Sequence, residues 1–192
     1  MRVGMHDFAL AYALSTLSGL RVSYPVAALS LASHEHLLRL PQSFAWLGSD
    51  TALTIVVIAC VVELIALKLS WFETPIHYVH KFLSPVVGGA AVFAVDPSQG
   101  FTGFALALLG GGNAFAVHRL RSTARATGSA FFLGAVNPFA SVLEDALVLC
   151  ALATAFSSTR TTAWIVFGVT AGCWLLTYRP VPRRGRRRRA RA

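Results

Sequence analysis

The strongest constraint on the fold is a series of long apolar runs that contain very few charges. A membrane-spanning helix needs about 20 mostly apolar residues in a row. Candidate spans lie at 8–33, 51–70, 78–95, 101–120, 131–156 and 162–178. Charged residues make up only 13% of the chain, against about 25% in soluble domains. We therefore expect an all-α, polytopic membrane helix bundle with about six transmembrane segments.

The length of 192 residues suits one compact bundle with no separate soluble domain. We assign 1–180 to a single integral membrane domain and 181–192 to a flexible basic tail. The segment at 78–95 begins with an unusually polar stretch around His80, Lys81 and Pro85. A spanning course and a re-entrant course both remain open for this segment.

The basic residues indicate an orientation. Cytoplasmic loops of membrane proteins carry an excess of Lys and Arg. With six spans and both termini inside, fourteen basic residues fall on the cytoplasmic side, and only Arg39 and Arg160 fall outside. Without the C-terminal tail, the bias is still seven against two. We expect a multi-pass protein of the bacterial cytoplasmic (inner) membrane with both termini in the cytoplasm.

The net charge of +9 comes largely from the tail, where seven arginines lie between Arg183 and Arg191. Such a cluster beside a membrane is attracted to anionic lipid headgroups by about 1 kcal/mol per charge. The expected partners are therefore the lipid bilayer and its anionic headgroups, and nucleic acid is not expected. A homo-oligomer or a membrane protein partner remains open.

Acidic residues interrupt two of the apolar runs in similar local strings. Glu63 ends Ala-Cys-Val-Val-Glu in the second run, and Glu144 ends Ala-Ser-Val-Leu-Glu in the fifth, where Asp145 follows. A carboxylate near the bilayer centre costs about 2.5–3.5 kcal/mol, so it needs a partner or a function. Repeats of three spans would be inverted, as in many secondary transporters. We predict a 3+3 inverted repeat with broken or re-entrant helices; a chance match is the alternative.

Other polar residues inside the runs complete a predicted site. Arg21 lies between Gly19 and Pro25, which weaken a helix. It either holds an anionic substrate group, pairs with Glu63 or Glu144, or reaches an interface. Glu144 and Asp145 are adjacent, so they should point about 100° apart and face different partners. The candidate substrate- or ion-binding or buried-charge residues are Arg21, Glu63, Lys68, Asn113, Asn137, Glu144 and Asp145.

Two further features have simpler interpretations. The run Gly110-Gly111-Gly112 is predicted to let helices approach closely. Glu73, His77 and His80 share one helical face, and such spacing can bind a metal, with His118 as a further candidate. Because no complete ligand set is present, His77, His80 and His118 are only weak metal candidates, and the cofactor is unknown.

Several of these elements together resemble a family of small bacterial multi-pass membrane proteins, the domain of unknown function 4126 family. The similar pieces are Ser18-Gly19-Leu20-Arg21 with Pro25, Glu63 to Lys68, Ile76 to His80 leading to Pro85, the glycine-rich fourth span, and Asn137-Pro138-Phe139 with Glu144-Asp145. They cover nearly the whole chain before the tail. Leu67 stands where the family tends to have an Asp before the lysine. The resemblance implies a membrane bundle and no particular activity.

Three functional hypotheses follow. The first is a small transporter or channel-like protein for an ion or small solute, in which Glu63 or Glu144 changes protonation or pairing as access alternates. The second is a non-catalytic assembly or stabilising subunit whose charges only hold helices together. The third and weaker one is a metal- or haem-binding membrane protein. No nucleophile and base occur at a diagnostic spacing, so an enzyme is not expected.

Overall fold

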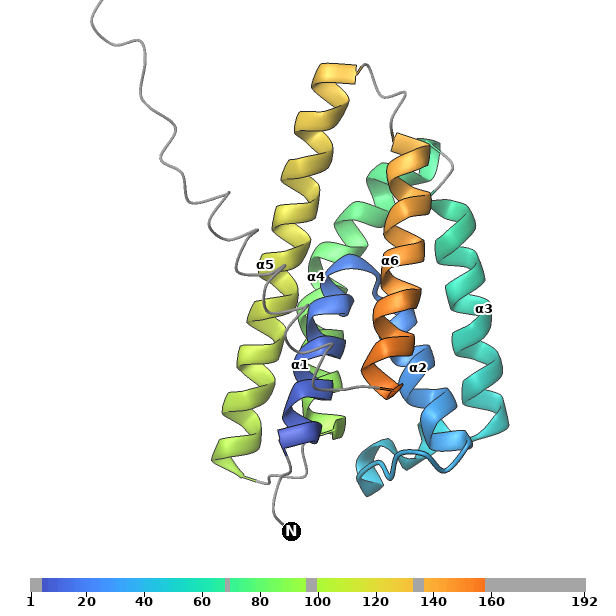
Figure 1. Ribbon diagram of the computed structural model, residues 1–192, viewed down its shortest axis with the longest axis vertical. Coiled ribbons are helices and arrows are strands. Elements are labelled where there is room, and N and C mark those ends of the chain that lie inside the picture. Colours follow the sequence, from blue (N-terminus) through green and yellow to red (C-terminus); the bar gives the residue numbers. More distant parts are fainter. Residues whose placement is uncertain (1–4, 68–69, 96–99, 133–136, 158–192) are drawn as a thin grey trace, which may run out of the picture.

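The computed structural model describes residues 5–67, 70–95, 100–132 and 137–157, and side chains within 8–67, 75–95, 100–124 and 142–157 (Figure 1). The helices are α1 (Met5–Leu20), α2 (Ser23–His34), the 3₁₀ helix η1 (Gln42–Gly48), α3 (Asp50–Ala66), α4 (Ser70–Val95), α5 (Phe101–Phe132) and α6 (Asn137–Ser157). The described residues contain no strand, so the prediction of an all-α fold is confirmed for them.

The described part of the chain contains helices that can cross a membrane. The segments Pro75–Val95 of α4 and Phe101–Ala124 of α5 are long and apolar enough. A third span results if η1 and α3, which are bent by 72°, count together. The outer surface of α3 is apolar from Ile55 onwards: Ile55, Val57, Ile58, Val61, Val62 and Ile65 are exposed. These helices indicate a membrane protein; six spans are not shown, and 162–178 lies outside the described residues.

The first predicted span is corrected, because 8–33 forms two helices that run in opposite directions. α1 runs parallel to α5, since Ser15 bonds to Gly110 and Gly19 lies against Ala114 further along both helices. α2 runs antiparallel to α3: its first turn meets Glu63 and its last residue, His34, meets the start of α3. α3 and α5 point the same way, so α1 and α2 form a helical hairpin (Figure 1).

The break in this hairpin has a local cause. The last helical bond of α1 runs from the Arg21 N–H to the Leu17 carbonyl, 2.8 Å. A continuing helix would need an N–H at residue 25 to bond to Arg21, and Pro25 has none. Within α2, Pro25 instead occupies the first turn, where the missing N–H costs nothing. The weak point predicted from Gly19 and Pro25 is therefore real, and it is a reversal of direction.

Glycines bring α4 and α5 into close contact. A Cβ on Gly89 would lie 2.8 Å from the Ala107 carbonyl oxygen, and one on Gly111 would lie 2.7 Å from that of Pro85. Both distances are too short for any side chain, whereas a Cβ on Gly112 would meet nothing within 4 Å. The packing role predicted for the glycine run is thus confirmed for Gly111, which faces the seam, and not for Gly112.

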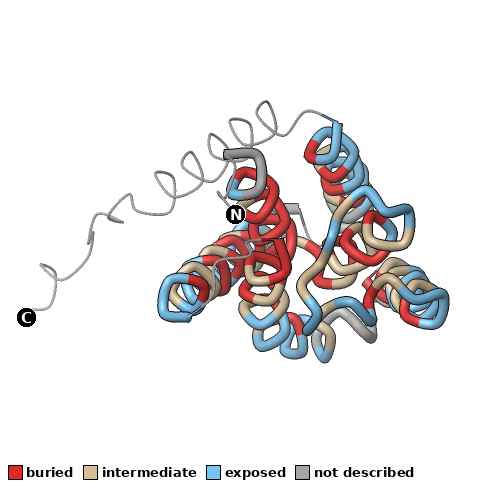
Figure 2. Tube along the Cα trace, turned by 90° about the horizontal axis from the view of Figure 1, so that it is seen from below, coloured by how far each residue is buried: buried red, intermediate tan, exposed pale blue. Residues whose placement is uncertain are grey.

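α1 lies at the centre of the bundle and is its most deeply buried helix. Ala13, Leu14 and Ser15 have no exposed surface. The buried residues lie towards the middle of the bundle in the view along its long axis (Figure 2). The core cluster also draws on α4 and α6, for example through Val92 and Val148. The end of α1 is consequently inside the bundle, where any polar group must be satisfied by protein.

Candidate functional site

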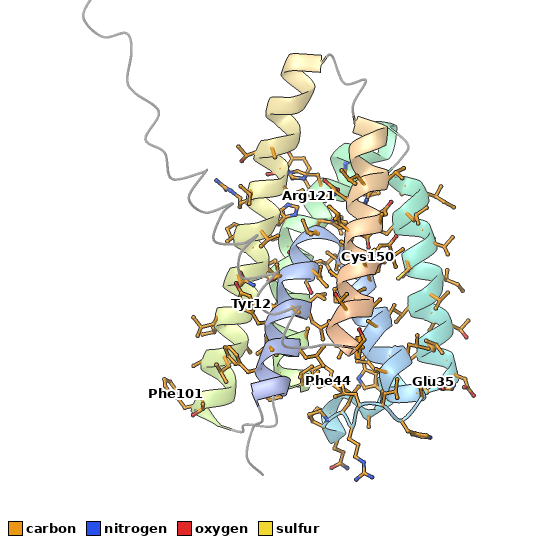
Figure 3. All side chains as sticks on the ribbon, in the orientation of Figure 1. Tyr12, Glu35, Phe44, Phe101, Arg121 and Cys150 are labelled. Atoms are coloured by element: carbon orange, nitrogen blue, oxygen red, sulfur yellow. The ribbon has the colours of Figure 1, made fainter. Side chains whose placement is uncertain are left out.

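The tip of the α1–α2 hairpin lies among charged side chains from four other helices. Arg121, contributed by α5, lies in the upper half of the bundle, far above Phe44 and Phe101 at its lower end (Figure 3). We call this set the buried charge network: it comprises Arg21, Glu63, His80, Arg121, Glu144 and Asp145. The hairpin thus ends inside the bundle and not at its surface.

Arg21 is the most buried member, with a side chain that is 1% exposed. Its Nη2 lies 2.6 Å from Asp145 Oδ1 and 3.9 Å from Glu144 Oε2. The partner is therefore an acid from the second half of the chain, and Asp145 makes a shorter contact than the candidate Glu144. The expectation that the two adjacent acids face different partners is wrong for Arg21, because its guanidinium lies within 4 Å of both.

Glu144 has a second and closer partner. Its Oε2 accepts a hydrogen bond from Arg121 Nε at 2.9 Å, and Arg121 Nη2 lies 2.8 Å away. These contacts form a charge-assisted pair with two guanidinium nitrogens, which is stronger than a neutral hydrogen bond. Glu144 therefore joins the two arginines, one from the hairpin tip and one from α5.

Glu63 caps the second helix of the hairpin from a distant part of the chain. Its carboxylate accepts hydrogen bonds from the Val22 N–H at 3.3 Å, from the Ser23 N–H at 2.9 Å, and from the Ser23 hydroxyl. These are the donors that an α-helix leaves without partners at its N-terminus, where the helix dipole also favours negative charge. On the other side, Glu63 Oε1 lies 3.4 Å from His80 Nε2.

Among its six described members, the network holds more carboxyl groups than arginines. Two arginines face three carboxyl groups, so the network carries one net negative charge when its acids are ionised and His80 is neutral. Such a charge is costly away from water, because the interior screens it poorly. One proton on His80 would bring this set of six to neutrality, and Glu63, 3.4 Å away, is the acid that an imidazolium there would face.

Two other histidines lie beside the network. The rings of His77 and His118 stack at a centroid distance of 4.9 Å and an interplanar angle of 26°. His118 is buried, and neither of its ring nitrogens has a hydrogen-bond partner among the described residues. The described side chains include no group of three or more His, Cys, Asp or Glu placed to hold a metal ion. The weak metal hypothesis for His77, His80 and His118 therefore gains no support from their geometry.

The remaining predicted residues lie elsewhere or cannot be placed. The Asn113 amide donates to Thr16 Oγ1 at 2.8 Å and to Ser15 Oγ at 3.3 Å, which ties α5 to α1 outside the network. Lys68 lies outside the described residues, and the side chain of Asn137 is not among those described. Asn113 is therefore a helix-packing residue here.

Sequence reasoning missed two contributors to the network. Arg121 is one of the fourteen basic residues that the charge rule assigns to the cytoplasmic side, but α5 continues to Phe132 and keeps it inside a helix. Ser23 was not singled out, although it is the first residue of α2 and donates to Glu63. Its position just before Pro25 was the available signal, since serine is favoured at helix starts.

The fold and the site define a class: a helical membrane protein with an ion-paired polar interior at a helix break. The chain matches the family model described as Domain of unknown function (DUF4126) over residues 8–179, and it belongs to that family. The match covers all of the described helices except the first residues of α1. No curated protein and no solved structure shows significant similarity to the chain.

Proposed function

We propose that the protein is a small transporter or channel-like protein for an ion or small solute. The observation that carries this proposal is the buried charge network at the tip of a helical hairpin. Ionisable residues within membrane helices are expensive and usually mark ion or substrate pathways. Broken helices inside the bundle supply backbone donors for such sites, as they do in many secondary transporters.

The mechanism we propose centres on Glu63. In the described state its carboxylate holds the N-terminus of α2 through Val22 and Ser23 while it also contacts His80. A change in the charge of either Glu63 or His80 alters this cap, and α2 is a helix of only 12 residues. Binding near the midplane would thereby change the position of the hairpin, and with it the side from which the site is open.

The inverted repeat is part of this proposal, with the α1–α2 hairpin in place of the first of the six predicted spans. α3 and α6, which carry Glu63 and Glu144, run in opposite directions, as inverted repeats require (Figure 1). The two halves differ in their first element, which is the α1–α2 hairpin in the first half and the continuous helix α5 in the second. We assign the end of the bundle that carries Arg119 to the cytoplasm, because cytoplasmic loops carry an excess of Lys and Arg. Because α1 and α2 form a hairpin, the start of α1 then lies at the outer end, and the C-terminal tail remains predicted inside.

The alternative is an assembly or stabilising subunit without transport activity. The observation that favours it is the closure of two ion pairs, Arg21 with Asp145 at 2.6 Å and Arg121 with Glu144 at 2.8 Å. Buried pairs of this kind can serve specificity of packing alone. In that case the partner would be a second copy of the chain or another membrane protein.

Charge-removing substitutions separate the two functions. Glu63→Gln and Glu144→Gln keep the shape of the side chains and remove their charge. For a transporter we expect folded variants that lose flux in proteoliposomes loaded with pH- and potential-sensitive dyes. For a structural subunit we expect lost stability or lost association and no flux in the unmodified protein. Glu35→Gln, at an exposed loop position, is the matched control and should change neither readout.

A further inference from the structure

We propose that the ion handled by this site is the proton, and that it reaches Glu63 through His77, His118 and His80. The inference rests on the proposed transport function and names its ion. His77 and His80 lie on α4 and His118 lies on α5, the two helices that pack most closely. The series leads to Glu63, the carboxylate that also caps α2. None of the three is needed for the Arg21–Asp145 or Arg121–Glu144 pairs.

The register between α4 and α5 aligns the histidines. These helices are antiparallel, with Gly88 against Gly110 and the Ser84 hydroxyl 3.2 Å from the Ala114 carbonyl oxygen. Continuing the same register by one turn places His80 level with His118. His77 lies one further turn along the same face of α4, and its ring stacks on His118. The order across the seam is therefore His77, His118, His80 and then Glu63, which is 3.4 Å from His80.

The first histidine of this series is exposed and the other two are buried. His77 is exposed, His118 is 2% exposed and His80 is 5% exposed. The buried ring of His118 has no hydrogen-bond partner on either nitrogen among the described residues. Leaving such groups unpaired is costly. A neutral imidazole accepts a proton on one nitrogen and releases one from the other, so the His118 ring could pass a proton when a water or a neighbouring ring comes within hydrogen-bond distance.

The charges around His80 act on an added proton in both directions: the Glu63 carboxylate favours it, and the two guanidinium groups oppose it. His80 is faced by Glu63 from α3, Arg21 from the hairpin tip, Arg121 from α5 and His77 from its own helix. Asp145 and Glu144 of α6 pair with the two arginines, and Tyr24 of α2 lies near Arg21 and Asp145. Whereas those two acids pair with arginines, the ion-pair partner described for Glu63 is His80. A proton taken from water onto His80 makes an imidazolium cation opposite the Glu63 carboxylate.

A metal cation fits this place less well than a proton. Hard cations take six or more oxygen ligands. Both oxygens of Glu63 already accept hydrogen bonds from Val22 or Ser23, and its other close neighbour is a ring nitrogen. A proton needs only that one nitrogen. Its transfer from His80 onto Glu63 would return His80 to neutrality and remove the negative charge that caps α2, which links proton uptake to the hairpin.

The test is potential-driven proton uptake into proteoliposomes that contain the full-length protein and the internal pH dye pyranine. A potassium gradient with valinomycin makes the interior negative. We expect internal acidification that falls at least about tenfold in His80→Gln and Glu63→Gln, and that slows in His77→Gln and His118→Gln, as for loss of a positioned proton carrier. His34→Gln is the matched control, since His34 pairs with Asp50 at the other end of the bundle.

Each outcome decides between the proposals. Unchanged acidification in His80→Gln overturns the histidine route. Vesicles that carry sodium, potassium or a neutral solute, but not protons, overturn the proton inference and leave the transport function standing. Vesicles that carry nothing, from protein that elutes as a single species, overturn both. If His80→Gln does not fold, ¹⁵N spectra of the unmodified protein replace it: a His80 ring that takes up no proton between about pH 3 and pH 8 overturns the inference.

Discussion

Removing Arg21 should destabilise the protein more than removing Arg21 and its acid together. Arg21 is 1% exposed and lies 2.6 Å from Asp145, which is 9% exposed. Arg21→Met leaves Asp145 as a buried charge without this partner, whereas Arg21→Met with Asp145→Asn removes both charges. The reasoning predicts that the second substitution restores part of the stability that the first one removes.

The size of the effect follows from the distance and the burial. At an effective dielectric constant of about 20, the Coulomb attraction at 2.6 Å is about 6 kcal/mol, from which the desolvation of both groups must be subtracted. Breaking a buried pair from one side typically costs about 3–5 kcal/mol. We expect Arg21→Met to cost that much. Asp145→Asn alone should cost less, because Glu144 remains 3.9 Å from Arg21. The double variant should recover at least about 1 kcal/mol relative to Arg21→Met.

The assay is the free energy of reversible unfolding in lipid bicelles, measured by steric trapping, for the four proteins of this double-mutant cycle. Folded yield after purification is a second readout. Arg39→Met, at an exposed loop position, is the control for loss of an arginine and should stay within about 0.5 kcal/mol of the unmodified protein. A double variant that is no more stable than Arg21→Met would refute the reasoning.

Two further predictions concern the fold. Gly111→Ala should cost about 1–3 kcal/mol in unfolding free energy, because its Cβ would lie 2.7 Å from a carbonyl oxygen of α4, whereas Gly112→Ala faces open space and should be neutral or slightly stabilising; equal effects would contradict the described seam. In a variant without native cysteines, Phe8→Cys and Ser43→Cys should react with an impermeant reagent from the same side, and Ser122→Cys from the opposite side. Labelling of Phe8→Cys together with Ser122→Cys would instead restore a single span over 8–33.

The sequence predicted the acidic and basic members of the site best, because a charge within an apolar run stands out. Glu63, Glu144, Asp145 and Arg21 could all be selected on that ground alone. Arg121 could not, since it lies in a basic segment that looks like a cytoplasmic loop until the full length of α5 is known. The partner choice between Glu144 and Asp145 depends on how α6 is rotated against the hairpin, which a single sequence does not encode in any local pattern.

The hairpin shows a similar limit. Gly19 and Pro25 predict a weak point in the first apolar run, but a kink and a reversal have the same local signals. The reversal depends on Glu63, which is 40 residues from Ser23 and supplies the cap for the returning helix. The histidines are a different case, because the spacing of His77 and His80 does predict that they share a face of one helix. Their position relative to His118 depends on how α4 packs against α5, which the glycine contacts determine.

The capping of α2 by α3 has a consequence for how the protein is made. The hairpin tip leaves the ribosome 40 residues ahead of the carboxylate that caps it, and α6, which holds the partners of Arg21, is the last described helix. During synthesis, α1 and α2 are therefore made before the residues that cap α2 and pair with Arg21. We expect them to wait at the membrane surface, or beside an insertion factor, and to enter the bundle only after α3 to α6 have assembled.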